Sequence, residues 1–185
     1  MEVYKCRICG DPYLGSGVPS HCPFCGAEAK YIVLAREWRE PGVFELSEVS
    51  EANLEHALML ENNNSRFYRC SFEVSTDVEL TAMFKALSKV EAEHASVIRK
   101  LLGLPKEGQV EDTRGRCHAL ESENLKEAHE REAKAIVFYA QAAEVAVEPR
   151  VKEVFTAFVE IEKTHLELNK KAMEAFPGMF NGPIA

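Results

Sequence analysis

Four stretches of this sequence carry an apolar stripe of helical period that turns acidic in its middle. The clearest spans residues 80–101, where Glu91 and His94 fall on the same face as leucine, isoleucine and phenylalanine side chains. The other three stripes contain Glu61, Glu132, and the pair Glu162 and His165. Four carboxylates at one depth of an apolar core require cations beside them, because an isolated buried charge is very costly. The pattern therefore predicts a mainly α protein, a four-helix bundle built around bound metal.

The bundle is encoded as an internal repeat whose two halves are offset by 71 residues. The offset superposes Glu61 on Glu132, Glu91 on Glu162 and His94 on His165. A single Glu-x-x-His motif is usually a solvated helix face. Here it recurs, with one Glu on each of the two remaining helices, and this set matches the ligands of di-iron and di-manganese carboxylate bundles. We therefore predict a dimetal site with six protein ligands, where two divalent ions balance four glutamates.

Two tyrosines, Tyr68 and Tyr139, lie two helical turns beyond Glu61 and Glu132. A tyrosine in a bundle core is normally hydrogen-bonded, and the nearest expected acceptor is a liganding carboxylate. We therefore expect each tyrosine to orient a metal ligand.

The connections between the helices differ in length. Short turns near residues 75–77 and 148–149 predict two antiparallel hairpins. The link from residue 104 to about residue 118 is longer, and some 15 extended residues span roughly 50 Å. That reach suits a crossover along the bundle, or equally a passage to a partner chain that would exchange hairpins between subunits.

The N-terminal region contains four cysteines in the pattern C-x2-C-x12-C-x2-C: Cys6, Cys9, Cys22 and Cys25. Two such pairs form a tetrahedral sulfur cage for one ion, and the spacing alone leaves iron and structural zinc open. A module this short needs the ion for much of its stability. We assign it to residues 1–40 and the bundle to residues 41–185. The remaining Cys70 and Cys117 are expected to be unreactive thiols, because nothing near them in sequence indicates a low pKa.

Charge and hydropathy exclude several classes of partner. The net charge of −8 disfavours nucleic acid and anionic membranes as ligands. No apolar run approaches the roughly 18 residues of a membrane-spanning helix, and the first residues lack the pattern of an export signal. We therefore expect a cytoplasmic protein.

Taken together, the two motif sets resemble the rubrerythrin family in its reversed arrangement, with the rubredoxin-like domain first. The segments 4–10 and 22–26 match the rubredoxin-like part, and the six Glu and His residues match the ferritin-like part. The resemblance implies a mononuclear four-cysteine iron that carries single electrons and a non-haem di-iron site that reduces hydrogen peroxide to water. It also implies an NAD(P)H-linked donor, either a reductase or rubredoxin, and a homodimer or larger homo-oligomer.

One position departs from the family pattern. Rubrerythrins typically carry a further Glu one turn after the third-helix ligand, whereas Glu132 is followed at that offset by Ala135. The repeat-equivalent Asn64 does not restore a carboxylate. In the family this extra Glu is associated with an iron that moves between ligands. We therefore expect a symmetric site in which His94 and His165 bind in every redox state.

The missing carboxylate leaves two alternatives to a peroxidase. The first is a di-iron oxidase or ferroxidase that uses dioxygen. The second is an iron storage or sensing protein with a structural zinc ribbon. Zinc or manganese substitution of the iron is possible, since thiolates suit zinc and carboxylates suit manganese.

Overall fold

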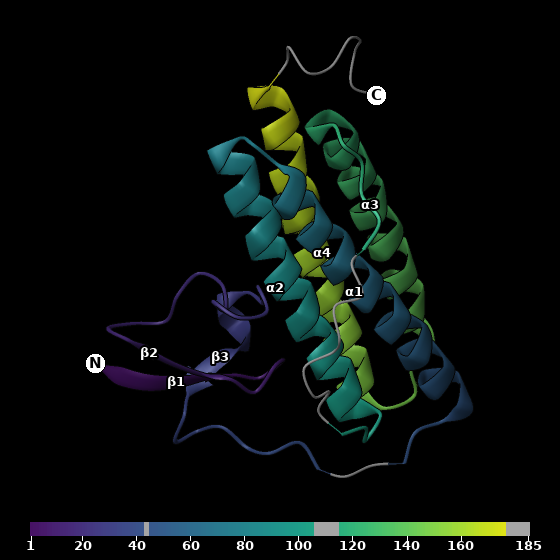
Figure 1. Ribbon diagram of the computed structural model, residues 1–185. Coiled ribbons are helices and arrows are strands. Elements are labelled where there is room, and N and C mark those ends of the chain that lie inside the picture. The colour runs from purple at the N-terminus through teal and green to yellow at the C-terminus, as the bar shows by residue number, and fades with distance from the viewer. Residues whose placement is uncertain (43–44, 106–114, 177–185) are drawn as a thin grey trace.

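The computed structural model describes residues 1–42, 45–105 and 115–176, and it contains a four-helix bundle with a small sheet docked on its side (Figure 1). The bundle helices are α1 (Glu48–Val74), α2 (Val78–Leu101), α3 (Glu121–Val145) and α4 (Pro149–Ala175). This architecture confirms the predicted fold class. None of the helices in the described part of the chain is long and apolar enough to span a membrane.

Local sequence signals explain where the helices begin. The Ser47 side chain accepts a hydrogen bond from the backbone N–H of Ser50 at the start of α1. Asp77 caps α2 in the same way through the N–H groups of Glu79 and Leu80. Pro149 occupies the first turn of α4, where its missing N–H costs nothing. The short turns make α1 with α2, and α3 with α4, antiparallel neighbours as predicted.

The two hairpins are joined by a link whose ends lie at opposite ends of the bundle (Figure 1). α2 ends near Gly103, which has a φ of +66°, and α3 begins at the opposite end of the bundle (Figure 1). Residues 106–114 of the predicted crossover lie outside the described residues. After them, the chain lies so close to α1 that a side chain at Gly115 would collide with the backbone of Arg66 and Phe67.

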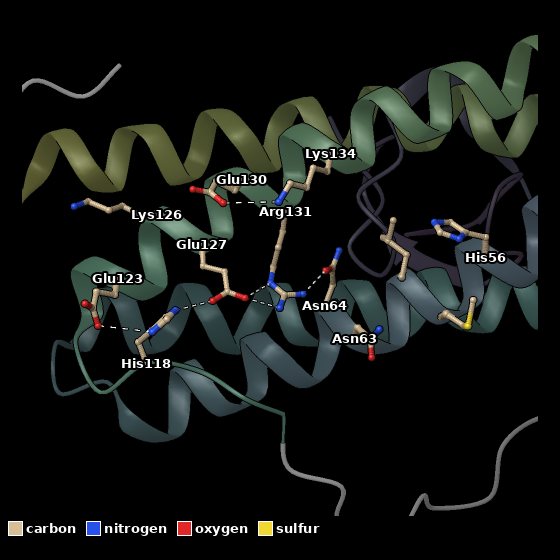
Figure 2. Close-up of a pocket in the computed structure, with 12 residues that line it drawn as sticks. His56, Asn63, Asn64, His118, Glu123, Lys126, Glu127, Glu130, Arg131 and Lys134 are labelled. Carbon is tan, nitrogen blue, oxygen red and sulfur yellow. Dashed lines mark hydrogen bonds and ion pairs between the residues drawn. The ribbon is translucent and has the colours of Figure 1, made fainter.

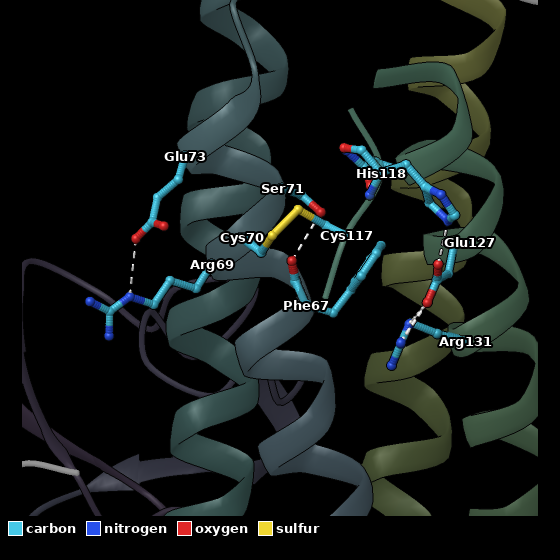
Figure 3. The surroundings of a disulfide bond; sticks show 10 residues. Phe67, Arg69, Cys70, Ser71, Glu73, Cys117, His118, Glu127 and Arg131 are labelled. Atoms are coloured by element: carbon cyan, nitrogen blue, oxygen red, sulfur yellow. Dashed lines mark hydrogen bonds and ion pairs between the residues drawn. A yellow bond between two sulfur atoms is a disulfide. The ribbon is translucent and has the colours of Figure 1, made fainter. Parts of the chain in front are cut away.

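The structure corrects one expectation at this link, since Cys70 and Cys117 form a disulfide (Figure 3). The bond joins α1 to the segment that leads into α3, across a sequence separation of 47 residues. The two cysteines showed no relation along the sequence. They become neighbours only because the link folds back onto α1.

The small sheet has the order β2-β1-β3 and is antiparallel throughout. Its strands are β1 (Glu2–Cys6), β2 (Pro12–Gly15) and β3 (Ile32–Leu34), with one 3₁₀ turn (Ala29–Tyr31) before β3. Several polar contacts attach this unit to α2 and α4, and four of them involve charged side chains. They are Arg7 to Glu153 (2.5 Å), Lys30 to Glu160 (2.5 Å), Lys100 to the Cys9 carbonyl (2.8 Å) and Arg150 to the Ile8 carbonyl (2.8 Å).

A carboxylate joins the two hairpins at one end of the bundle. Glu148, just before α4, accepts a hydrogen bond of 2.6 Å from the backbone N–H of Ser47, just before α1. Burial opposes its ionisation, but Ser50 and the Ser47 amide face the carboxylate and lower the pKa of Glu148 to about 2. The ionised form therefore stabilises the junction of the hairpins.

We predict that Glu148→Gln lowers the free energy of unfolding by about 1–3 kcal/mol at pH 7, because the charged acceptor of the Ser47 hydrogen bond is replaced by a weaker, neutral one. The folded-state pKa is depressed, so the advantage of the wild type is full above the unfolded pKa near 4.5 and shrinks as the pH falls toward 2. Denaturant unfolding at pH 7, 4.5 and 3 measures the difference. The exposed Glu144→Gln serves as the control, and equal losses in both variants would contradict the prediction.

We predict that reduction of the disulfide, or Cys70→Ser, lowers the free energy of unfolding by up to about 4 kcal/mol, as loop-closure entropy gives for this separation. A thiol titration of unfolded, metal-free protein checks the bond itself. Four thiols should react before reductant is added and six afterwards, matching the four free cysteines and the bonded pair. Six reactive thiols in both samples would show that the bond does not form.

Candidate metal centres

The structure brings the six predicted bundle ligands together at one depth of the core. They form two overlapping groups, Glu61, Glu91, His94 and Glu162 on one side and Glu91, Glu132, Glu162 and His165 on the other. Within each group the potential ligand atoms lie within 4.8 Å of one another. Glu91 and Glu162 belong to both groups, so they are placed to bridge two ions.

The two Glu-x-x-His motifs face each other across the bundle from α2 and α4. Nδ1 of His94 lies 3.1 Å from Oε2 of Glu91 and 3.4 Å from Oε1 of Glu162. Nδ1 of His165 lies 3.0 Å from Oε2 of Glu162 and 3.2 Å from Oε1 of Glu91. The two copies of the sequence repeat therefore have equivalent geometry in the structure. This equivalence agrees with the expected symmetric arrangement of both imidazoles.

The electrostatics of the cluster favour bound cations. Burial, reinforced by Glu91, raises the pKa of Glu61 well above its usual range, and burial with Glu162 does the same for the pKa of Glu132. Burial opposes the charge on His165, but Glu162 and Glu91 outweigh it and raise the pKa of that imidazole to about 10. The carboxylates of this cluster therefore strongly favour positive charge beside them.

Each of the four glutamates also retains one carboxylate oxygen without a hydrogen-bond partner. These are Oε2 of Glu61, Oε1 of Glu91, Oε2 of Glu132 and Oε1 of Glu162. All four side chains are fully buried, where an unpartnered carboxylate oxygen is very unfavourable. Carboxylate oxygens together with imidazole nitrogens suit iron and manganese. The donor set therefore fits a dimetal site.

The two tyrosines lie where the sequence predicts, and each bonds to a ligand on the opposite hairpin. Tyr68 of α1 donates to Oε1 of Glu132, and Tyr139 of α3 donates to Oε1 of Glu61. Burial raises the pKa of both phenols well above the usual value, so both stay protonated donors. Each bond occupies one oxygen of its glutamate and leaves the other, Oε2, free for a metal ion.

The four N-terminal cysteines form a sulfur cage of the size that a metal requires. Sγ of Cys6 lies 3.7 Å from Sγ of Cys25, and Sγ of Cys9 lies 3.8 Å from Sγ of Cys22. A tetrahedron with metal–sulfur bonds of about 2.3 Å has edges of nearly the same length. Backbone N–H groups of Ile8 and Asp11 point at two of the sulfurs, as is typical of iron–sulfur sites.

The cage and the carboxylate cluster are in direct contact within one chain. Nε2 of His94 lies 2.9 Å from the carbonyl oxygen of Cys25. Because Nδ1 of His94 faces the carboxylates, Nε2 carries the hydrogen that it donates to this carbonyl. One imidazole therefore joins a residue of the sulfur cage to the ligand set of the bundle.

Gly26 makes this contact possible. Its φ of +78° is unfavourable for other residues, and a Cβ there would lie 3.2 Å from Cγ2 of Ile161 and 3.9 Å from Nε2 of His165. Gly26 thus forms the turn after Cys25 and also allows the small domain to approach α4 closely. The sequence indicates the turn but not the approach.

Sequence reasoning missed one residue beside the cluster. Arg131 adjoins the ligand Glu132, donates to Oδ1 of Asn64 at 3.1 Å, and is held by Glu127 at 2.5 Å. At Asn64 the sequence indicates only that a carboxylate is lacking. An arginine reaching from α3 to α1 has no sequence motif that would identify it.

Comparisons with known proteins agree with this geometry. The family model described as Rubrerythrin matches residues 52–173. Reverse rubrerythrin-1 of Clostridium acetobutylicum is 29% identical over 115 residues, which cover 56% of this chain and 63% of that relative. The chain is thus matched to less than two thirds of the length of this relative. No solved structure matches the chain.

We predict that Glu91→Ala abolishes metal binding in the bundle, because Glu91 belongs to both ligand groups, and leaves the four-cysteine ion in place. Metal counts per chain, by elemental analysis of anaerobically reconstituted protein, should fall to the single ion of the cysteine cage. The exposed Glu167→Ala, on the same helix as Glu162, is the matched control and should keep the full count. A full metal count in Glu91→Ala would contradict the bridging role.

Proposed function

The chain belongs to the rubrerythrin family, and on that basis we propose that it reduces hydrogen peroxide to water with electrons relayed through its four-cysteine iron. The family match and the reverse rubrerythrin relative support a di-iron oxidoreductase of oxidative-stress defence. The sulfur cage and the carboxylate–histidine cluster fit a mononuclear iron centre and a di-iron site.

The proposal divides the chain into a rubredoxin-like domain, residues 1–40, and a ferritin-like domain, residues 41–185. Cys6, Cys9, Cys22 and Cys25 would hold the single iron, and Glu61, Glu91, His94, Glu132, Glu162 and His165 would hold the di-iron pair. When bound, the pair would supply the two electrons that cleave the O–O bond, and the four-cysteine iron would supply their replacements one at a time. Two protons complete the conversion of one peroxide to two waters.

The observation that carries the proposal is the hydrogen bond from His94 to the carbonyl of Cys25. It places a ligand residue of one centre in contact with a ligand residue of the other, inside one chain. Such contact serves electron transfer. A storage protein needs only the bundle, and a structural zinc ribbon is redox-inert. Neither alternative explains why a residue of the cage is hydrogen-bonded to His94.

The remaining residues of the cluster orient ligands and exclude water. Tyr68 and Tyr139 fix the carboxylates of Glu132 and Glu61 from opposite hairpins. The four glutamates are fully buried, so the reacting molecule meets fixed protein dipoles rather than bulk solvent. The cluster is therefore preorganised for a small oxidant.

A second candidate uses dioxygen as the oxidant, as an oxidase or ferroxidase. It is favoured by Ala135, which is fully buried beside the cluster at the position where rubrerythrins typically have an additional Glu. The protein partners we propose are an NAD(P)H-linked reductase or a rubredoxin as electron donor, and further copies of this chain in a homo-oligomer. We place the reaction in the cytoplasm, where such donors operate.

We predict that hydrogen peroxide reoxidises the chemically reduced, iron-loaded protein at least about tenfold faster than dioxygen at equal concentration. Stopped-flow absorbance at the thiolate charge-transfer bands of the four-cysteine iron follows the reaction, because that iron loses its electron to the di-iron site. Faster reoxidation by dioxygen would instead favour the oxidase. Zinc in the cysteine cage of protein from the native host would favour storage or sensing.

A further inference from the structure

The buried cluster is closed on three sides. On the histidine side, the small domain covers it through the Cys25 carbonyl and Gly26. Toward the α3–α4 turn, the ring of Tyr139 packs against Phe155 and Phe158 at centroid distances of 5.7 and 5.2 Å. Toward the α1–α2 turn, a second aromatic group, which includes Tyr68 and Phe84, fills the core. On these three sides the described residues cover the cluster with protein.

The remaining side faces the gap between α1 and α3, and there the structure has a groove of about 720 Å³ (Figure 2). Its walls come from α1, from α3 and from His118 just before α3. Asn64 lines its inner part, is only 3% exposed, and lies one turn along α1 from the ligand Glu61. Two residues of the groove, Asn64 and Arg131, are thus close in sequence to the ligands Glu61 and Glu132.

Asn64 is incompletely hydrogen-bonded in a way that points to a ligand. Its Oδ1 accepts from Arg131, whereas its Nδ2 is buried without any partner. Buried N–H donors are rarely left unpaired, because the lost hydrogen bond costs about 1–3 kcal/mol. A small molecule with an acceptor oxygen would satisfy Nδ2 at the inner end of the groove.

Arg131 lies across the same passage. Its guanidinium is held by Glu127 at 2.5 Å and by Asn64 at 3.1 Å (Figure 2). It also lies 4.4 Å from the ring centroid of Phe67. The side chain is 28% exposed, so one face of it meets solvent. Displacing it would open a direct path from solvent to Asn64.

The charges on the groove are balanced. Three cationic side chains, Lys126, Arg131 and Lys134, accompany three carboxylates, Glu123, Glu127 and Glu130. Ion pairs join Arg131 to Glu127 and Lys134 to Glu130. A funnel for ferrous ions would instead carry an excess of carboxylates. The groove is therefore suited to an uncharged molecule.

We propose that this groove, lined at its inner end by Asn64 and closed by Arg131, is the entrance through which a small uncharged oxidant, of the chemical class of hydrogen peroxide, reaches the dimetal site. The inference rests on the proposed function and names the path of its substrate. Asn64 acts as a positioning residue and Arg131 as the gate.

Nitric oxide, a neutral diatomic molecule that binds ferrous sites, tests the entrance without turnover. We predict that Arg131→Ala raises the association rate of nitric oxide with the reduced di-iron site about threefold or more, because the gate is removed. Asn64→Leu should lower that rate by roughly tenfold, because an apolar branched side chain fills the inner end and removes the donor. Stopped-flow absorbance and EPR report the binding, and the four-cysteine absorption reports that the small domain is intact.

The control is Lys152→Ala, which removes an exposed cation from α4 outside the groove and should leave the rate unchanged. In variants with a full metal count, any pattern of association rates other than faster in Arg131→Ala, slower in Asn64→Leu and unchanged in Lys152→Ala contradicts the proposed entrance. Should Asn64→Leu fail to load metal, the partly exposed Arg131→Ala decides alone, since a rate within twofold of the wild type excludes gating.

Peroxide reoxidation of the wild type separates this proposal from the proposed function. In one outcome, the groove variants change the nitric oxide rates in a protein that peroxide does not reoxidise. That result would support the entrance and contradict the peroxidase activity. Rapid reoxidation by peroxide, with unchanged nitric oxide rates in both variants, would do the opposite.

Discussion

The burial of four carboxylates in an apolar bundle is the constraint on which the rest of the structure depends. Each glutamate is fully enclosed, and each keeps one oxygen that no protein donor satisfies. Such a core is unfavourable unless cations occupy it, so folding of the bundle and metal binding are thermodynamically linked. The tyrosines complete the arrangement by holding the other oxygen of Glu61 and Glu132 from the opposite hairpin.

Much of this could be predicted from the sequence because the signals are periodic. Helical stripes, a repeat and paired cysteines all depend on local spacing, and they identified the bundle and both donor sets in advance. The Cys70–Cys117 disulfide, the bond from Arg131 to Asn64 and the approach of Gly26 to Ile161 were missed. Each joins segments far apart in the chain. Their positions depend on how the link folds back and how the small domain docks, and no local pattern encodes either.

The geometry separates the two reactants of the proposed peroxidase. Electrons would arrive on the side of α2 and α4, where the sulfur cage contacts His94. The oxidant would arrive between α1 and α3, where Arg131 controls access to Asn64. Keeping the two routes on opposite sides of one cluster protects the exposed part of the electron path from the oxidant.

The contact between His94 and Cys25 has a further consequence for the duplicated bundle. The repeat supplies two equivalent imidazoles, but within the described residues only His94 is hydrogen-bonded to the sulfur cage, while His165 meets the small domain through Gly26. Because the small domain contacts the two imidazoles differently, the two halves of the bundle become unequal although their metal ligands are the same. The repeat is thus preserved in the ligands, while the surroundings of its two imidazoles differ.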